Sequence, residues 1–192
     1  MDYNFFALMS RMRYIGRWGL MRSVQPENVS EHSHMVAVLA HALAVIENEK
    51  FGGTLDVGEV AIAALYHDAP EILTGDLPTP VKYYNPEIKT AYKAVEQTSA
   101  ERLLALLPPE FQPIYRPYVS ETCDPNVERV VKVADKLSAY IKCVEELKAG
   151  NNEFRLAAQQ TRAALEAIDL PALGYFMEYF LPGFELTLDE LQ

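Results

Sequence analysis

The sequence predicts an all-α fold, a helical bundle of seven or eight helices in a single domain. No stretch shows the alternation of apolar and polar residues that a half-buried strand requires. Residues that begin and end helices recur along the chain, with apolar runs between them. The 192 residues contain no repeat and no low-complexity linker, and this length suits one core of ordinary size.

Three helices are expected in the N-terminal part. A short amphipathic helix covers residues 3–14. Ser30 can cap a second helix over 30–49, since a serine oxygen can accept the free N–H groups of a first turn. Asp56 and Glu59 match the Asp-x-x-Glu variant of a capping box and begin the third helix.

A proline is expected to end the third helix. Pro70 lacks an N–H and disfavours helical geometry at the residue before it. That helix should therefore kink or stop just after the adjacent pair His67 and Asp68. Pro78 and Pro80 are expected to keep the following loop extended.

The C-terminal part is divided by helix-capping residues. Asp124 followed by Pro125 is an N-cap with proline at the first helical position. Gly150 stands at the C′ position of the same helix, where glycine is favoured. The expected helices cover residues 86–107, 110–120, 127–149, 153–168 and 172–180.

The net charge restricts the classes of ligand that the protein is expected to bind. The net charge of −10 argues against a polymeric nucleic acid, whose binding requires many phosphates to be neutralised. A small anion remains compatible, because Arg11, Arg13, Arg17 and Arg22 form a local basic stretch.

Compartment signals point to the cytoplasm. Cys123 and Cys143 form no CxxC pair, and we expect two reduced, partly buried thiols. No signal-peptide pattern is apparent at the N-terminus. The longest apolar run, from Met35 to Ile46, is far short of the roughly 20 residues that span a bilayer, so no membrane association is expected.

The chain has four histidines, of which three lie on the second helix. His32 and His34 are about 200° apart around that helix, on opposite faces. His34 and His41 share a face but lie about 10 Å apart along the axis, too far to bind one ion together. This helix can therefore supply one ligand, either His32 or His34, to a mononuclear site.

A cluster of ionisable residues follows in the apolar third helix. His67 and Asp68 lie beside Val, Ile, Leu and Ala, and Glu71 comes within one further turn. Burying such groups without a partner is costly, so a divalent cation is an economical explanation. Asp135 lies in the middle of another apolar helix, where aspartate is disfavoured. It could be a further ligand, or it could pair with a Lys or Arg on a half-exposed face.

His32, His67-Asp68 and Asp135 together resemble the H…HD…D signature of the HD-domain metal-dependent phosphohydrolases. Within that superfamily, four segments resemble the bacterial 5′-deoxynucleotidases of the YfbR type: RWGLMR, NVSEHS, YHDAPEILTGDLPTPVKYYN and KVADKLSAYIKCVEELKAGNNEF. They occur in order over residues 17–154. Pro70, between the His67-Asp68 pair and Glu71, departs locally from the family pattern but removes no functional group.

The resemblance implies one divalent metal ion held by His32, His67, Asp68 and Asp135. It implies hydrolysis of deoxyribonucleoside 5′-monophosphates to deoxynucleoside and phosphate, with discrimination against ribonucleotides. Cobalt, manganese or copper would be plausible, with zinc possible, since mixed imidazole and carboxylate ligands suit such ions. A homodimer is also implied, and the aromatic stretch 175–180 could pack internally or at its interface.

The resemblance also suggests roles for further residues. Arg17 would bind the phosphate, since its planar fork can hold two oxygens. Trp18 would lie near C2′ and exclude a ribose hydroxyl by a clash, although a sole tryptophan can equally serve packing. Glu71 would orient the attacking water or transfer a proton. Substrate contacts are expected from the loop residues Asp76, Leu77, Pro78 and Thr79, and from His32, Asp68 and Asp135.

Two other functions fit the same residues. One is an HD phosphodiesterase that acts on cyclic or oligonucleotide substrates, with the same metal ligands in a more open cleft. The other is a non-catalytic helical module that retains an HD-like core for packing. Against the second stands the presence of all four ligand-type residues together with Arg17 and Glu71.

Overall fold

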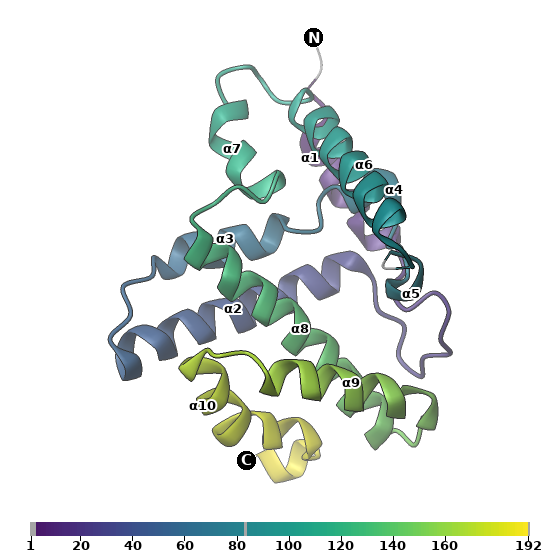
Figure 1. Ribbon diagram of the computed structural model, residues 1–192, viewed down its shortest axis with the longest axis vertical. Coiled ribbons are helices and arrows are strands. Elements are labelled where there is room, and N and C mark those ends of the chain that lie inside the picture. Colours follow the sequence, from purple (N-terminus) through teal and green to yellow (C-terminus); the bar gives the residue numbers. More distant parts are fainter. Residues whose placement is uncertain (1–2, 83, 192) are drawn as a thin grey trace.

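Two long helices, α2 (Val29–Phe51) and α8 (Pro125–Lys148), cross at the centre of the protein (Figure 1). A third helix, α3 (Val57–Tyr66), packs against both. Leu43 and Leu137 are fully buried in the core that these helices share. The central helices fix the relative positions of side chains that are distant in the sequence.

The computed structural model describes residues 3–82 and 84–191. These ranges contain helices, turns and one isolated antiparallel bridge, between Gly16 and Asn28. The prediction of an all-α fold is therefore confirmed. Ten α-helices occur in the described ranges against the seven or eight predicted, and two of them are only four residues long. Such short helices carry little signal in a sequence, because they contain no repeat of the 3.6-residue period.

Two further groups of helices cover the central ones (Figure 1). On one side α6 (Pro86–Leu104) and α7 (Gln112–Val119) enclose a second core with Phe5 and Leu107. On the other side lie α9 (Arg155–Glu166) and α10 (Pro171–Tyr179). The shorter elements are α1 (Phe5–Met9), η1 (Ser10–Tyr14), α4 (Glu71–Thr74), α5 (Thr79–Lys82), η2 (Asn152–Phe154), η3 (Leu181–Glu185) and η4 (Leu188–Leu191).

The start of α2 differs from the prediction. Asn28, not Ser30, is its N-cap: the Asn28 side chain accepts a hydrogen bond from the Glu31 N–H at 3.0 Å, and the Glu31 carboxylate accepts one from the Asn28 N–H at 3.3 Å. This reciprocal capping box satisfies two free N–H groups at once. The predicted caps Asp56 and Asp124 are confirmed, and so is Gly150, which adopts φ 83° just beyond α8.

The predicted break at Pro70 is present, but it lies slightly earlier. α3 ends at Tyr66, and residues 67–70 form a turn. Pro70 has no N–H for the Tyr66 carbonyl, which instead accepts from Ala69 at 2.9 Å. His67 and Asp68 therefore lie in the turn and not in the helix.

Two other expectations about local structure were wrong. The loop after Pro78 is not extended, because residues 79–82 form α5, with Pro80 in a first turn that needs no N–H from it. The single helix expected over 3–14 is divided into α1 and η1. The Ser10 hydroxyl donates to the Ala7 carbonyl at 2.8 Å where the two meet, a local bond that competes with regular helix.

By length and composition alone, α2 could cross a membrane, and it is the one helix of the described ranges that could. Half of its most apolar stretch is buried inside the protein. Its apolar character therefore fits its position at the centre of the bundle.

A buried carboxylate ties the loop before α2 to α8. Glu146 is 1% exposed, and it accepts hydrogen bonds from the N–H groups of Val24 at 2.8 Å and Gln25 at 3.1 Å. The buried Lys142 ammonium donates to Glu146 and to the Gln25 carbonyl. Burial raises the pKa of Glu146, but the hydrogen bonds from Lys142, Val24, Asn151 and Gln25 outweigh it and lower the pKa to about 2.

Glu146→Gln should lower the free energy of unfolding at pH 7 by about 3 kcal/mol, because it leaves a buried ammonium without its counter-charge. Since folding lowers the pKa of Glu146 from 4.5, its contribution is present above pH 4.5 and is lost as the pH falls toward 2. The difference between wild type and Glu146→Gln should therefore shrink over that range. Urea unfolding at several pH values measures it.

Glu166→Gln is the matched control, because Glu166 pairs with Arg162 on α9 with both side chains more than half exposed. It should change the stability by less than about 1 kcal/mol. Equal stability losses in the two variants would contradict the anchoring role of Glu146.

Candidate functional site

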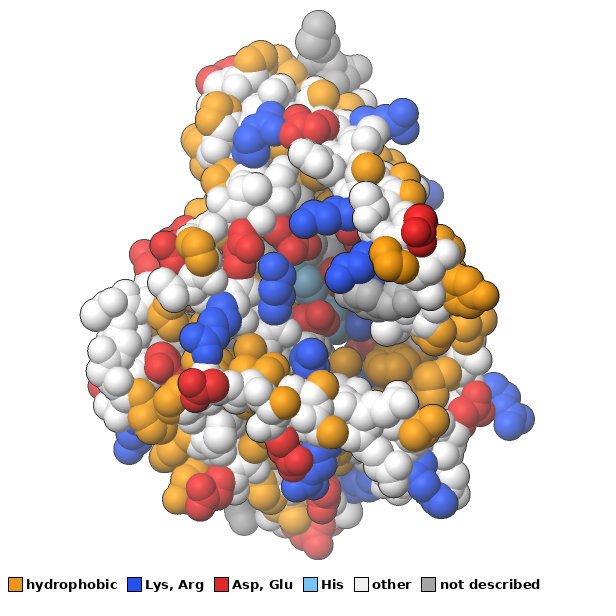
Figure 2. Space-filling model, in the orientation of Figure 1, with side chains coloured by type: hydrophobic (Ala, Val, Ile, Leu, Met, Phe, Trp, Pro, Cys, Tyr) orange, Lys and Arg blue, Asp and Glu red, His pale blue; other side chains and the backbone are white. Residues whose placement is uncertain are grey.

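A hollow lies between α6 and the central helices α3 and α8. Figure 2 shows a histidine side chain at its floor, with acidic and basic side chains around it. Charged groups of both signs thus gather at one place in a protein with a net charge of −10.

Three helices bring four ligand-type residues to this floor. His32 comes from the first turns of α2, His67 and Asp68 from the turn after α3, and Asp135 from the middle of α8. Ligand atoms of His32, His67 and Asp135 all lie within 4.8 Å of one another. Asp68 Oδ2 lies 3.5 Å from His32 Nε2 and 3.3 Å from His67 Nε2, so it faces the same point.

The facing atoms lack hydrogen bonds. Within the described ranges, His32 Nε2, His67 Nε2 and Asp68 Oδ2 are buried without a hydrogen-bond partner. Buried polar atoms are normally paired, and three unpaired ones at a single point need an explanation. A cation that accepts their lone pairs supplies one, so this residue set fits a divalent metal ion.

The far sides of both imidazoles support this assignment. His67 Nδ1 lies 2.7 Å from the Ala64 carbonyl, which can only accept, so Nδ1 carries the proton. His32 Nδ1 lies 3.3 Å from the Ser138 hydroxyl. An imidazole that donates from Nδ1 presents the lone pair of Nε2, which is the usual arrangement of a metal-bound histidine.

Opposite charges within the cluster stabilise one another. Burial lowers the pKa of His67, but Asp68 and Asp135 raise it above its usual value. Burial raises the pKa of Asp135, but the adjacent His32 imidazole, followed by the charges of His67 and Arg17, brings it well below its usual value. The structure does not support a pair of Asp135 with a Lys or an Arg, because the ion-pair contact of this carboxylate within the described chain is with His32 Nε2, at 3.0 Å.

Arg17 and Trp18 lie beside this cluster. The Arg17 Nη1 atom is 3.5 Å from Asp68 Oδ2. Burial lowers the pKa of Arg17, but Asp68, Asp135 and Glu27 keep it raised, so the guanidinium is charged. Trp18 packs on Phe154 with ring centroids 5.2 Å apart.

Two further carboxyl groups line the site. Glu71 is 7% exposed, and burial together with Asp68 and Asp76 raises its pKa to about 9. Burial also raises the pKa of Asp76, while Arg17 and a hydrogen bond from the Trp18 backbone N–H lower it. Asp76 is therefore near both members of the Arg17-Trp18 pair.

The remaining predicted residues are less constrained. Leu77 and Pro78 are half-buried in the loop, and Thr79 is exposed at the start of α5. Their contacts with a substrate remain predictions. His34 and His41 are exposed on α2, away from the residues that meet at the site, so their exclusion agrees with the geometry.

Sequence reasoning missed Glu27 and Ser138. Ser138 follows Asp135 by three residues and so shares its helix face, a spacing that could have suggested it. Glu27 gave no comparable signal, because it lies in a loop and reaches Arg17 through tertiary structure.

Comparisons with known proteins point to one family. The family model described as 5′-deoxynucleotidase YfbR-like matches residues 4–184. A 5′-deoxynucleotidase of Vibrio parahaemolyticus is 53% identical over 99% of this chain and 98% of its own length. The 5′-deoxynucleotidase YfbR of Escherichia coli O1:K1 is 52% identical over 98% of this chain and 95% of its own.

Solved structures share the fold. An HD-domain phosphohydrolase from Listeria innocua superposes with a TM-score of 0.82 at 26% identity, covering 94% of this chain and 88% of that one. A cyanophage HD phosphohydrolase, described as bound to dA and one catalytic Zn²⁺ ion, gives a TM-score of 0.65 at 24% identity over 97% and 100% of the two chains. The chain therefore belongs to the YfbR-like 5′-deoxynucleotidase family of HD-domain phosphohydrolases.

Proposed function

We propose that the protein is a metal-dependent 5′-deoxynucleotidase. It hydrolyses deoxyribonucleoside 5′-monophosphates to deoxynucleoside and phosphate and discriminates against ribonucleotides. The observation that carries this proposal is the set of unpaired buried atoms of His32, His67 and Asp68 beside Asp135, with a charged Arg17 next to them. The names of the family and of the relatives above point to the same activity.

His32, His67, Asp68 and Asp135 would hold one divalent ion. When bound, it would supply a Lewis acid for a phosphate oxygen and lower the pKa of a water molecule toward neutrality. Two imidazoles with two carboxylates suit cobalt, manganese or copper, and zinc is compatible with them as well. The buried setting excludes competing water from the imidazole nitrogens.

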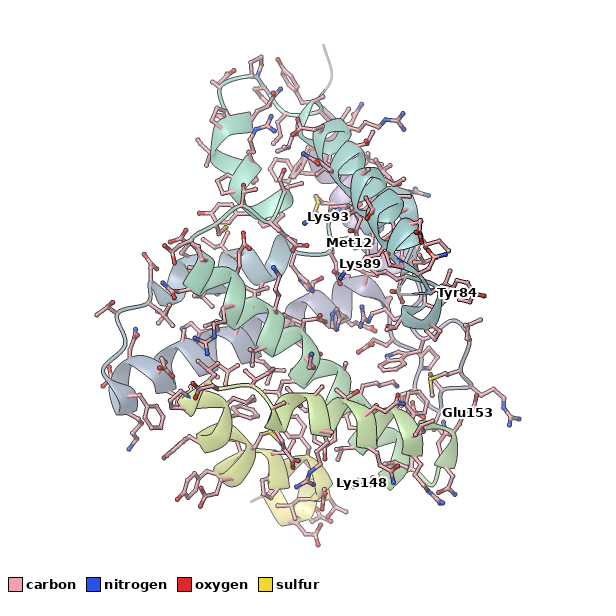
Figure 3. The ribbon with its side chains drawn as sticks, in the orientation of Figure 1. Met12, Tyr84, Lys89, Lys93, Lys148 and Glu153 are labelled. Atoms are coloured by element: carbon pink, nitrogen blue, oxygen red, sulfur yellow. The ribbon has the colours of Figure 1, made fainter. Side chains whose placement is uncertain are left out.

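Arg17 is the phosphate-binding residue in this proposal. Its Nε is hydrogen-bonded to Glu27, which leaves the Nη1 and Nη2 donors for two phosphate oxygens. In Figure 3, Lys89 and Lys93 of α6 point toward the same hollow. These ammonium groups would attract an anionic substrate despite the overall negative charge.

Glu71 is the proton-transfer residue in this proposal. Hydrolysis forms a bond from water oxygen to phosphorus and breaks the bond from phosphorus to O5′, which must take up a proton. A buried carboxyl group with a raised pKa can donate that proton or hold the attacking water. Asp76 accepts a hydrogen bond from the Trp18 backbone N–H and would bind the sugar.

Trp18 would select the sugar. Its indole and the Arg17 guanidinium both donate to Glu27 Oε2, so a phosphate bound to Arg17 would bring the attached sugar close to the ring. A bulky ring at C2′ leaves no space for a hydroxyl group. Substrate contacts from Leu77, Pro78 and Thr79 would complete this side of the pocket.

Assembly as a homodimer is part of the proposal. Tyr179 and Phe180 expose apolar rings at the end of α10, with 60% and 50% of their surface accessible. Their rings lie next to Tyr175, at centroid distances of 4.5 and 6.2 Å. A second copy of the chain would cover this aromatic cluster.

The metal assignment is tested by comparing two histidines on α2. His32→Ala should reduce the affinity for Mn²⁺ or Co²⁺ by more than about 100-fold, since losing a ligand costs more than losing an outer hydrogen-bond partner. His34→Ala, on the exposed face of the helix, should retain wild-type affinity. Elemental analysis after dialysis and calorimetric titration measure both. Equal affinities in the two variants would contradict the assignment.

The activity is tested by measuring phosphate release from a panel of nucleotides. Deoxyribonucleoside 5′-monophosphates should be hydrolysed with added divalent ion, and ribonucleoside 5′-monophosphates should have a kcat/KM at least about tenfold lower. A chelated preparation should be inactive. Undiminished turnover after chelation would contradict the metal role, and preferential cleavage of cyclic nucleotides would favour a phosphodiesterase instead.

A further inference from the structure

A single carboxylate oxygen holds both side chains that the proposed function assigns to substrate recognition. Glu27 Oε2 accepts a hydrogen bond from Arg17 Nε at 3.0 Å and a second one from Trp18 Nε1 at 2.9 Å. Adjacent residues on an extended chain normally point to opposite sides, so their meeting on one oxygen needs a special backbone.

The backbone at this point provides that geometry. Trp18 adopts φ 60°, in the left-handed region that non-glycine residues rarely enter. Such strain persists only where surrounding contacts hold it, and it is found preferentially at functional sites. The Trp18 side chain supplies two of those contacts, its hydrogen bond to Glu27 and its packing on Phe154.

The two chain segments are also paired directly. Gly16 and Asn28 form an antiparallel bridge, and on either side of it the Arg17 N–H donates to the Glu27 carbonyl at 2.9 Å and the Val29 N–H to the Ile15 carbonyl at 2.9 Å. This pairing places Glu27 opposite Arg17. This backbone pairing therefore fixes the position of Glu27 independently of its two side-chain hydrogen bonds.

Charge strengthens the contact. The side chains of Arg17 and Glu27 are 13% and 17% exposed, so solvent screens their attraction only weakly. Arg17 also has Asp68 near its Nη1 at 3.5 Å, and this carboxylate could draw the guanidinium toward the metal ligands. The bond from Nε to Glu27 opposes that movement.

We propose that Glu27 is the positioning residue that sets Arg17 and Trp18 in one fixed relation, so that phosphate binding and exclusion of ribonucleotides depend on the same carboxylate. The inference rests on the proposed roles of Arg17 and Trp18. It assigns Glu27 no contact with substrate. Its action is to orient the guanidinium plane and the indole ring.

Glu27→Ala should free both side chains. The kcat/KM for dAMP should fall by about 10- to 100-fold, mainly through KM, because a small displacement of a positioning group has effects of this size. The ratio of kcat/KM for dAMP over AMP should fall to the value that Trp18→Ala gives. Because this ratio compares two substrates of one preparation, partial unfolding of a variant does not change it.

Glu27→Gln distinguishes the hydrogen bond to Trp18 from the charged interaction with Arg17. The amide oxygen can still accept from the indole N–H, but the charge that holds Arg17 is lost. We expect the dAMP over AMP ratio to remain near wild type while KM for dAMP rises. The double variant Glu27→Ala/Trp18→Ala should have the same ratio as Trp18→Ala alone, because the two residues act as one unit.

Trp18 is the sole tryptophan, so fluorescence reports on it without any substrate. Glu27→Ala should shift the emission to longer wavelength and increase quenching by acrylamide. Glu153→Gln is the control. Glu153 lies in η2 and pairs with Arg22, which is in the same loop as Glu27, and it does not pair with Arg17 or Trp18. It should leave emission, quenching and substrate ratio unchanged.

The outcomes distinguish this inference from the proposed function. Wild-type emission, quenching and substrate ratio in Glu27→Ala would overturn the positioning role. If Trp18→Ala left the ratio unchanged, the proposed role of Trp18 would be wrong, while the fluorescence of Glu27→Ala would still decide whether Glu27 holds the ring.

Discussion

The structure depends on one electrostatic constraint, the burial of two imidazoles and a carboxylate whose free atoms face one point. His32 and His67 are 1% and 9% exposed, and neither Nε2 atom has a hydrogen-bond partner in the described chain. Such an arrangement is unfavourable unless something compensates for it. Asp135 and a bound cation together can do so, and the carboxylates near the site are in turn balanced by Arg17.

The fold meets this constraint because helices α2, α3 and α8 pack against one another at the site. Each helix contributes ligand-type residues at a different place along its length: an early turn of α2, the turn after α3 and the middle of α8. The same α8 also holds Glu146, which anchors the loop before α2. Asp135 and the loop that carries Arg17 and Trp18 are thus both fixed to α8, as a precisely built site requires.

Much of the fold could be predicted from local sequence, because helix boundaries depend on local hydrogen bonding. Asp56, Asp124 and Gly150 were identified correctly for this reason. The cap of α2 was misplaced at Ser30, because Asn28 and Ser30 are both good caps and only the reciprocal bond with Glu31 decides between them. The short helix α5 was missed, because proline is compatible with both a first turn and an extended loop.

The candidate site was partly predictable. His67, Asp68 and Asp135 stood out as ionisable residues in apolar surroundings, whereas the choice of His32 over His34 came from family resemblance and agrees with the burial of His32. Glu27 could not be found in this way, since its two bonds depend on the pairing of residues 15–17 with 27–29 and on the backbone of Trp18. Contacts made by tertiary structure leave no periodic pattern in a sequence.

The most direct test of the central claim is a crystal structure with Mn²⁺ or Co²⁺ and anomalous diffraction data. The account predicts one strong anomalous peak bonded to His32 Nε2, His67 Nε2, Asp68 and Asp135 at about 2.0–2.2 Å. A cation located elsewhere, for example in the cavity of about 540 Å³ lined by Asp56, Glu59 and Asp124, with the four residues unligated, would contradict it.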